Sequence, residues 1–396
     1  MHLRALPLPV LVAVATVAVA CGGSGQEPDV SRDTDAAVAA DGASDAPAEV
    51  AAPGLPYRAL YEAVQATALG FAHPDGDWTD DFGDAAYYGP AFFRWAGQAY
   101  GRPDYLAPAD QGLAHDLDVV RRSNADSAYF FGHLEEGLMA ALGLLEDIGL
   151  TGDTSNLSDL EAYLDQVDKV VKGFKLYLDV PIQSYALDTY GPTTNTAVMA
   201  LLNLRYAELL DTPREAERVQ FGRDVLAKID ERAWNGTYYR FRPDDDWLEI
   251  YPNISMIVAN GTAFVVTGEA AYRERAEAAY RGMQPLKDAK GGYRSPYSAA
   301  TMGATTDDYE TLSAQNYTLL ALARLTEITG DLAYRDEIPE ILGFIDGWLL
   351  VDGRLLHHWM DGRVAIPSDP EYFCTGCNLQ FLYVMLYAEQ KLYGGR

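Results

Sequence analysis

From Leu55 onward, apolar residues recur every three or four positions, which is the period of amphipathic α-helices. The pattern predicts twelve helices of ordinary length. They cover residues 55–72, 83–100, 103–121, 127–148, 157–175, 192–211, 214–233, 253–267, 270–285, 308–329, 331–347 and 371–393. Two shorter stretches have the alternation and turn residues of β-hairpins, 237–241 with 247–250 and 354–359 with 363–366.

A recurring signal marks the starts of alternate helices. Glycine is followed by an acid or a proline and then by a tyrosine at 101–105, 268–272 and 330–334, with variants at 152–153 and 211–213. Glycine ends one helix in a left-handed cap, and the acid or proline opens the next helix. The marks lie roughly 50–60 residues apart, so each unit is predicted to be a helical hairpin that stacks on its neighbours.

Six hairpins with this period and punctuation resemble the six-hairpin glycosidase superfamily over residues 55–393. The resemblance implies an all-α fold, an (α/α)6 toroid of inner and outer helices with short β-hairpins in its rim loops. A tetratricopeptide superhelix has a period of about 34 residues, which does not fit the spacing. In the toroid the long connections lead into the inner helices, so their polar residues converge on one cleft. The inner helices are expected to begin near residues 83, 127, 192, 253, 308 and 371.

The connection into the first inner helix concentrates acidic and aromatic side chains at 76–88. Acids held together in a partly dry cleft raise the pKa of one of them, which provides a general acid near neutral pH. The alternative is structural, because aspartate caps helices and the helix dipole stabilises its charge. The candidate catalytic acids here are Asp80, Asp81 and Asp84, and the candidate sugar-stacking residues are Trp78, Tyr87 and Tyr88.

The connections into the third and fifth inner helices hold further acids. The Asp307-Asp308 pair resembles the catalytic aspartate pair of endo-α-mannanase-like members of the superfamily, although helix capping explains the same residues. Asp188 is a candidate general base or acceptor for a sugar hydroxyl. The neighbouring candidates for sugar binding are Tyr185, Tyr190 and Tyr309.

Histidines and arginines in other connections supply alternatives. Sugar epimerases with this toroid use histidines as acid and base, a role that the resemblance offers to His357 and His358. Other candidates for sugar binding are Tyr129, His133, Trp359 and Tyr372, although a lone histidine on a helix is more often a packing residue. A uronate carboxylate has bidentate candidates, which otherwise only balance nearby acids, in Arg240, Arg242, Arg294 and Arg363.

Two carboxylates in one cleft suit glycoside hydrolysis, in which one protonates the leaving oxygen and the other activates water or stabilises the transition state. We therefore expect a glycoside hydrolase that acts on an oligosaccharide or polysaccharide, with no cofactor and no metal site. The chain has no Walker A loop, G-x-G-x-x-G fingerprint, HExxH or G-x-S-x-G motif, which disfavours nucleotide-dependent and triad chemistry. The alternatives are a non-catalytic glycan-binding protein and an epimerase that uses the two histidines.

The N-terminal segment has the features of an export signal. Residues 1–20 carry Arg4 and then an apolar run too short to span a bilayer, which is typical of a signal peptide. Small residues before Cys21 resemble the bacterial lipobox, which implies that this cysteine is lipidated. Residues 21–54 are predicted to be a disordered acidic tether to a body at 55–396. Since Gly22 follows the cysteine, the resemblance places the protein at the outer membrane of a Gram-negative cell envelope.

Charge and cysteine content restrict the partners. The chain has 58 acidic and 30 basic residues, a formal net charge of −28, which excludes a general nucleic-acid binder. A polybasic contact with lipid is disfavoured too, so the lipid anchor is the expected membrane contact, and we expect a monomer. Cys374 and Cys377 are expected as a local disulfide or two free thiols. Zinc bound with His357 or His358 is a weaker alternative, because a single C-x-x-C has no second ligand pair.

Overall fold

The structure is a computed structural model that describes residues 54–72, 84–173, 185–244, 247–295, 297–298, 303–304, 309–360 and 373–394. The chain divides into the units Met1–Ala51 and Ala52–Arg396. The predicted signal peptide, Cys21 and the tether up to residue 53 lie outside the described residues. The predicted body corresponds to the second unit, which is the subject of the following description.

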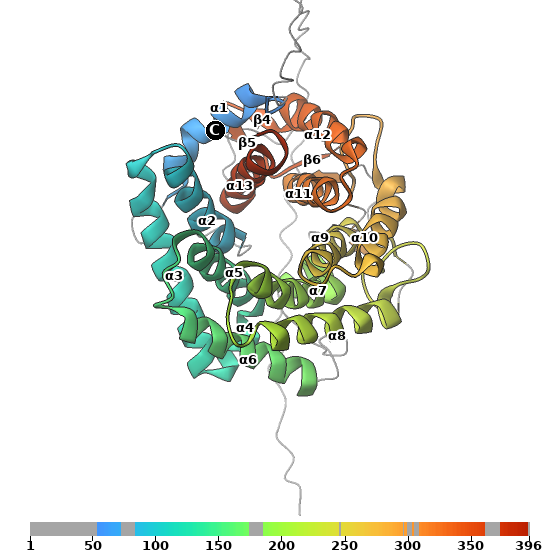
Figure 1. Cartoon of the computed structure of the whole chain (residues 1–396). Coiled ribbons are helices and arrows are strands. Elements are labelled where there is room, and N and C mark those ends of the chain that lie inside the picture. Colours follow the sequence, from blue (N-terminus) through green and yellow to red (C-terminus); the bar gives the residue numbers. More distant parts are fainter. Residues whose placement is uncertain are drawn as a thin grey trace, which may run out of the picture. The chain divides into compact units, whose positions relative to one another are not determined.

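Helices of the second unit alternate between an inner and an outer ring (Figure 1). The inner helices are α2 (Asp84–Ala99), α5 (Leu134–Thr151), α7 (Tyr185–Leu209), α9 (Ile250–Thr267), α11 (Leu312–Thr329) and α13 (Thr375–Leu392). The outer helices are α1 (Arg58–Thr67), α3 (Leu106–Ala125), α6 (Leu157–Gly173), α8 (Glu215–Ala233), α10 (Ala270–Met283) and α12 (Leu332–Phe344). Each inner helix contacts the next, and α13 contacts α2, so the inner ring closes. The predicted (α/α)6 toroid is confirmed.

Short helical pieces complete the rings. A six-residue helix, α4 (Ser127–Gly132), precedes α5, so the predicted helix at 127–148 is two helices. In α7 the backbone is non-helical at Gly191, and the regular helix begins at Pro192, as the sequence predicts. The remaining turns are the 3-10 segments η1 (Ala68–Phe71), η2 (Pro103–Tyr105) and η4 (Gln284–Leu286) and the π-helical turn η5 (Ile345–Leu349).

The predicted glycine punctuation explains the short turns that leave the inner helices. Gly152, Gly268 and Gly330 end α5, α9 and α11 with φ of 72°, 70° and 71°, a conformation that glycine adopts without steric cost. Asp331 then opens α12, because its side chain accepts a hydrogen bond from the Ala333 amide at 2.9 Å. The turns at the C-terminal ends of these inner helices are therefore tight, and the longer connections lie at the N-terminal ends of the inner helices.

The inner helices are buried on nearly all sides. In α9, 14 of 18 residues are buried, because the helix contacts two inner neighbours and the outer helix α10. Among the described residues, α9 is the helix long and apolar enough to span a bilayer by composition. Its burial within the ring accounts for that apolarity, since a helix packed on every face needs no polar side.

A polar contact joins the first helices of the ring to the last. The Glu389 carboxylate of α13 accepts hydrogen bonds from the Arg58 guanidinium of α1 and from the Tyr100 hydroxyl that follows α2. The Tyr100 hydroxyl also lies 3.2 Å from that of Tyr61. These contacts connect segments more than 280 residues apart in sequence.

Short strands lie in the connections that lead into the inner helices. Pairing joins β1 (Tyr297–Ser298) to β2 (Gly303–Ala304), β3 (Tyr309–Thr311) to β6 (His358–Met360), and β4 (Leu350–Val351) to β5 (Arg354–Leu355), all antiparallel. Among the described residues, the predicted contact of 237–241 with 247–250 appears as a bridge between Arg240 and Leu248 and a backbone hydrogen bond from Phe241 to Trp247.

The stretch 354–359 forms β5 and the start of β6. Asp352 and Gly353 form a tight positive-φ turn that joins β4 to β5, and β6 pairs with β3. The predicted partner of this stretch, 363–366, lies outside the described residues. One sequence prediction needs correction here. The helix predicted from residue 308 begins at Leu312, because β3 pairs with β6 first. Thr311 then caps the helix by accepting from the Ala314 amide at 3.1 Å.

Candidate functional site

All six inner helices line one cavity inside the ring. About 50 Å³ of its interior is open to the centre of a water molecule, and all the space between its atoms, together with open solvent, is about 640 Å³. The lining is mainly aromatic and aliphatic, with a few polar groups, which is the usual composition of a small-molecule site. The lining residues are Tyr87, Tyr88, Met139, Leu142, Val198, Leu201, Arg205, Ser255, Val258, Tyr317, Leu320, Arg324, Tyr383 and Tyr387.

Tyrosines form the aromatic part of the cavity wall. The Tyr88 ring centroid lies 5.5 Å from that of Tyr383 and 6.2 Å from that of Tyr317. The Tyr87 hydroxyl donates to the Tyr383 hydroxyl at 3.0 Å. Burial raises the pKa of Tyr87 and Tyr383 well above the usual tyrosine value, so both are neutral phenols. The wall therefore offers flat apolar faces edged by neutral hydroxyl groups.

Beyond the tyrosines, charged side chains pair with one another across the inner helices. The Arg205 guanidinium donates to both oxygens of Glu146, at 2.7 and 3.1 Å, and its Nη1 lies 2.7 Å from Glu208 Oε2. Arg324 of α11 also donates to both Glu208 oxygens, at 2.9 and 3.2 Å. Two bidentate pairs therefore connect α5, α7 and α11.

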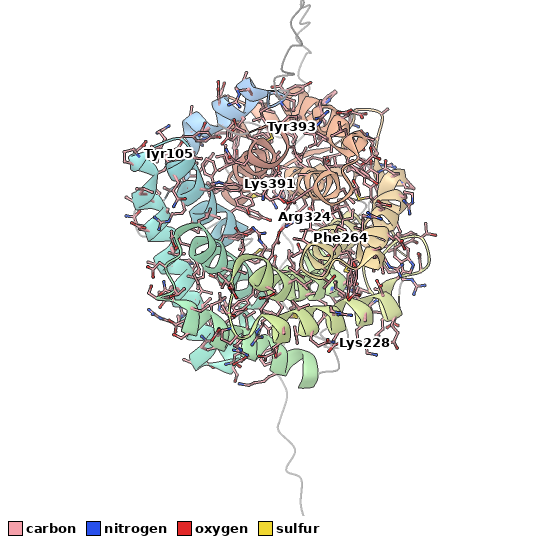
Figure 2. The ribbon with its side chains drawn as sticks, in the orientation of Figure 1. Tyr105, Lys228, Phe264, Arg324, Lys391 and Tyr393 are labelled. Carbon is pink, nitrogen blue, oxygen red and sulfur yellow. A yellow bond between two sulfur atoms is a disulfide. The ribbon has the colours of Figure 1, made fainter. Side chains whose placement is uncertain are left out.

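The same chain of contacts continues to α13 and α2. Arg324 also donates to Glu327 at 3.0 Å, and the Tyr387 hydroxyl donates to the same Glu327 oxygen at 2.7 Å. At the other end, Tyr87 of α2 lies within 3.3 Å of Glu146 Oε1. We call Glu146, Arg205, Glu208, Arg324, Glu327 and Tyr387 the ionic belt. In Figure 2 Arg324 lies on the inner side of the helical ring.

One glycine makes the belt possible. A Cβ atom at Gly261 of α9 would lie 2.5 Å from Cγ of Arg324, so glycine leaves the passage that the arginine stem occupies. Arg324 thereby passes α9 to reach Glu208 on α7, 116 residues away in sequence. The facing arginines hold the pKa of Glu208 at about 2 although burial opposes this. The Glu208 carboxylate is therefore ionised across the physiological range.

A second buried charged cluster lies directly before α11. The Glu310 side chain is fully buried, and its Oε1 lies 3.2 Å from Lys290 Nζ, which also lies 2.5 Å from Asp288. Burial, followed by the hydrogen bond with Asp288, raises the pKa of Glu310 to about 8, and Lys290 only partly offsets this. Glu310 is thus a protonated acid near neutral pH, next to the connection that holds Asp307 and Asp308.

The two adjacent histidines contact each other. Nδ1 of His357 lies 3.0 Å from Nδ1 of His358, so one ring donates and the other accepts. Burial and the neighbouring His358 lower the pKa of His357 to about 4, and burial lowers that of His358. Two neutral imidazoles can accept protons, whereas an acid–base pair for epimerisation needs one of them charged.

The structure describes only part of the predicted site. Outside the described residues lie Cys21, Trp78, Asp80, Asp81, Asp307, Asp308 and Tyr372. The backbone alone is described for six others: Asp84 begins α2, Tyr185, Asp188 and Tyr190 lie at the start of α7, and Tyr309 and Trp359 lie in β3 and β6. Each of these segments enters an inner helix, as expected from the sequence.

Of the predicted sugar-binding residues with described side chains, Tyr87 and Tyr88 line the cavity. Tyr129 and His133 do not line it. The His133 ring stacks on Tyr129 with centroids 4.1 Å apart, and its Nδ1 lies 2.9 Å from Glu136. The exposed α4 turn holds this pair against Arg122 at the end of α3, outside the cavity.

A disulfide joins Cys374 and Cys377 at the start of α13. Cys374 is the N-cap residue, and its sulfur accepts from the Cys377 amide at 2.9 Å. Both cysteines are buried. The local disulfide considered in the sequence analysis is therefore the observed state, and it removes these sulfurs as thiolate ligands for zinc.

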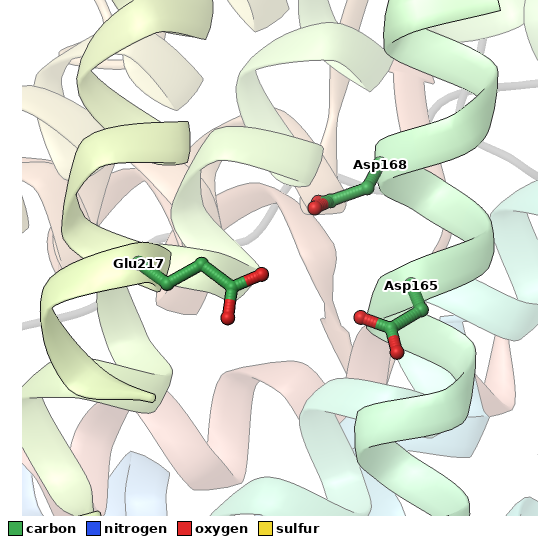
Figure 3. A group of neighbouring side chains, drawn as sticks. All are labelled: Asp165, Asp168 and Glu217. Atoms are coloured by element: carbon green, nitrogen blue, oxygen red, sulfur yellow. The ribbon is translucent and has the colours of Figure 1, made fainter. Parts of the chain in front are cut away.

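One group of three acids outside the cavity has the spacing of a metal site. Asp165 and Asp168 of α6 and Glu217 of α8 place carboxylate oxygens within 4.8 Å of one another (Figure 3). Arg218 donates to Asp165 at 2.6 Å and to Asp168 at 3.3 Å. Arg214 donates to Asp165 at 2.5 Å and to Glu217 at 3.0 Å. Two arginines already pair with these three acids, and the group joins two outer helices; we call it the outer ionic group.

The belt and most cavity tyrosines were missed by sequence reasoning. Tyr317, Tyr383 and Tyr387 lie within inner helices rather than in their entry connections. Tyr383 and Tyr387 are one helical turn apart, which is the signal that marks a shared face. On helices that are apolar all round, however, that spacing does not tell the cavity side from the side facing the outer ring.

Comparisons with known proteins agree with this architecture. No protein-family model and no curated protein matches the chain. Among solved structures, a D-mannose isomerase matches with a TM-score of 0.57 and 12% identity, covering 82% of this chain and 96% of that one. The cellobiose 2-epimerase of Bacillus thermoamylovorans B4167 matches with a TM-score of 0.56 and 12% identity, covering 82% and 99%. This chain has the six-hairpin (α/α)6 toroid fold.

A third match is the GH76A α-1,6-mannanase of Salegentibacter sp. HEL1_6, with a TM-score of 0.58 and 13% identity, covering 84% of this chain and 98% of that one. An isomerase, an epimerase and a mannanase thus all match the fold of this chain. At such identities the likeness establishes the fold, and the chemistry must be argued from this chain's own site.

Proposed function

We propose that this protein is a carbohydrate-active enzyme, a glycoside hydrolase that binds its sugar in the cavity of the inner ring. The observation that carries the proposal is the cavity itself, to which all six inner helices contribute and which five tyrosines line. Tyrosine presents a flat apolar face with a polar edge, which suits a sugar ring with its apolar C–H face and equatorial hydroxyls. The matched isomerase, epimerase and mannanase support a sugar substrate.

For the reaction, we propose that acids in the entry connections work as a pair. One would come from Asp80, Asp81 or Asp84 and the other from Asp188 or the Asp307-Asp308 pair. An inactive variant of the Salegentibacter mannanase, with two adjacent aspartates replaced, binds α-1,6-mannotriose. That supports an adjacent pair as the chemistry-bearing element, and protonated Glu310 lies two residues beyond the pair in this chain.

The test is a screen of oligosaccharides for released reducing ends, repeated with Asp81→Asn and Asp308→Asn. Each substitution is expected to lower kcat by about 10²–10⁴-fold, because a general acid or base contributes that much. The control Asp118→Asn removes an exposed acid of α3 and should change nothing. Unchanged hydrolysis in both variants would refute the acid assignment. Tight sugar binding without turnover would indicate a binding protein.

Epimerisation is the second candidate, because the rings of His357 and His358 contact each other, and it would require one of these two neutral imidazoles to be charged. An epimerase would move a carbon-bound proton without breaking a glycosidic bond. Incorporation of solvent deuterium at a sugar carbon, lost in His358→Gln, would identify this reaction.

We further propose that the enzyme is a lipoprotein of the cell envelope, attached through Cys21 at the outer membrane. The support is the lipobox-like sequence before Cys21 and the acidic tether that follows it. The disulfide at the start of α13 is compatible with an oxidising compartment. Metabolic labelling with a fatty acid should tag the wild-type protein and not Cys21→Ser.

A further inference from the structure

Two arginines line the cavity, and both pair with protein carboxylates. Among the described residues that line the cavity, the cationic side chains are Arg205 and Arg324. Arg205 contacts the carboxylates of Glu146 and Glu208, and Arg324 contacts those of Glu208 and Glu327. Each guanidinium therefore directs its planar donor groups at two protein carboxylates rather than at the cavity.

The charges of the ionic belt leave no excess of positive charge. Two guanidinium groups face three carboxylates, and Lys391, half exposed, lies 3.8 Å from Glu327 on the solvent side. Side-chain exposure is 5% for Glu146 and Arg324 and 13% for Glu208, so water screens these charges little, whereas the Glu327 side chain is 28% exposed. An added anion would find no cation to pair with here.

Arginines elsewhere do not change this balance within the described residues. The Arg240 guanidinium donates to the Pro243 carbonyl at 3.0 Å, and that of Arg294 donates to the Pro285 carbonyl at 3.1 Å. Arg242 lies over the ring of Phe241, 5.5 Å from its centroid. None of these three lines the cavity, and the fourth candidate for binding a uronate, Arg363, lies outside the described residues.

From this arrangement we infer that the cavity selects uncharged sugars and rejects uronates, with the ionic belt as the specificity determinant. The inference rests on the proposed function. A carboxylate brought against the belt would lose its water and meet Glu146, Glu208 and Glu327 with both arginines occupied, which is strongly unfavourable. A neutral sugar has no such cost, since tyrosine faces and the Ser255 hydroxyl can take its apolar and hydroxyl groups.

The test compares two ligands that differ in one group. Calorimetry would measure Kd for α-1,6-mannotriose and for the same trisaccharide oxidised to a carboxylate at C6 of its non-reducing end, and likewise for cellobiose and its terminal uronate. The wild-type protein is expected to bind at least one neutral sugar and to bind its uronate counterpart at least about tenfold more weakly, the minimum cost expected of an unpaired charge.

Two variants assign this discrimination to the belt. Glu327→Gln removes the more accessible belt carboxylate, leaves Arg324 with one fewer partner and should bring the two Kd values within about threefold. Glu208→Gln should do the same if Glu327→Gln fails to fold, as judged by thermal unfolding. Glu217→Gln makes the same charge change in the outer ionic group and should keep the tenfold ratio.

The outcomes separate the two claims. Equal or tighter binding of the uronate by the wild-type protein would overturn the inference and leave the proposed function intact. An unchanged ratio in the folded belt variants would also overturn it, because the belt would not then determine specificity. If neither neutral sugar nor any other glycan of the screen binds, the proposed function fails and the inference fails with it.

Discussion

Two clusters in this protein use the same side chains in different surroundings. The outer ionic group combines two arginines with three acids between α6 and α8, and the ionic belt combines two arginines with three glutamates inside the ring. Asp165 and Glu217 of the outer group are 44% and 52% exposed, whereas Glu146 and Glu208 of the belt are 5% and 13% exposed. Two of the three outer acids reach water, although Asp168 is buried, whereas Glu327 is the belt acid with the greatest exposure, at 28%.

The difference shows that location, more than composition, gives a charged cluster its role. Exposed pairs gain little, because water screens the attraction and solvates each charge separately. Buried pairs must match every charge, since any unpaired one retains its full cost of dehydration. The belt therefore matters to stability, and through its charge balance it also matters to which ligand the cavity accepts.

The largest difference between the clusters is expected in the free energy of unfolding that is lost when one arginine is removed from each. Arg324→Met removes the bidentate partner of Glu208, which is 13% exposed, and is expected to cost about 3–5 kcal/mol in free energy of unfolding. Arg214→Met in the outer group should cost about 1 kcal/mol or less. Chemical denaturation of both variants measures these losses, and equal losses would show that burial does not distinguish the clusters.

The second largest difference between the clusters is expected in how the stability of the fold depends on acidic pH. Because the pKa of Glu208 is about 2 in the folded protein against an ordinary 4.5, its ionisation stabilises the fold above pH 4.5. That stability is lost as the pH falls from 4.5 toward 2, a change of up to about 3 kcal/mol. Glu208→Gln should flatten the stability profile between pH 5 and 2. Glu217→Gln should alter it much less; similar profiles for the two variants would contradict the account.

The passage for Arg324 provides a test without any change of charge. Gly261→Ala places a methyl group 2.5 Å from the Arg324 side chain and should cost about 1–3 kcal/mol through overpacking. Gly132→Ala in α4, where an added Cβ meets nothing within 4 Å, should be neutral or slightly stabilising. Thermal unfolding compares the two, and a tolerated alanine at Gly261 would mean that the arginine does not need this passage.

The smallest change in free energy of unfolding is expected when an exposed acid of the outer ionic group is neutralised. Asp165→Asn should change the free energy of unfolding by less than about 1 kcal/mol. Because salt screens exposed charges, most of that change should disappear at about 0.5 M NaCl. Denaturation at low and high salt checks this, and a loss that persists in salt would mean that Asp165 belongs with the buried charges.

The ring could be predicted from sequence because its determinants are local. The three- to four-residue apolar period predicts each helix, and the glycines at 152, 268 and 330 end the inner helices where the pattern indicates. The prediction failed at residues 309–311, where pairing with β6 delays the helix. That pairing joins segments 49 residues apart and leaves no local signature.

The cavity was harder to predict because its determinants are not local. Tyr87 and Tyr88 were found because they lie beside an entry connection, whereas Tyr317 and Tyr383 lie on helices that are buried on nearly every face. The belt depends on the contact of Glu208 with Arg324, 116 residues apart, and on a glycine in a third helix. No spacing rule in the sequence joins these three positions.

The central claim is that the tyrosine-lined cavity of the inner ring holds the sugar. A crystal structure with the tightest-binding oligosaccharide of the screen tests it most directly. The account predicts a sugar ring inside the cavity, in contact with Tyr317 and Tyr383 and with the ionic belt unchanged. A sugar bound on the outer helices while the cavity remains unoccupied would contradict it.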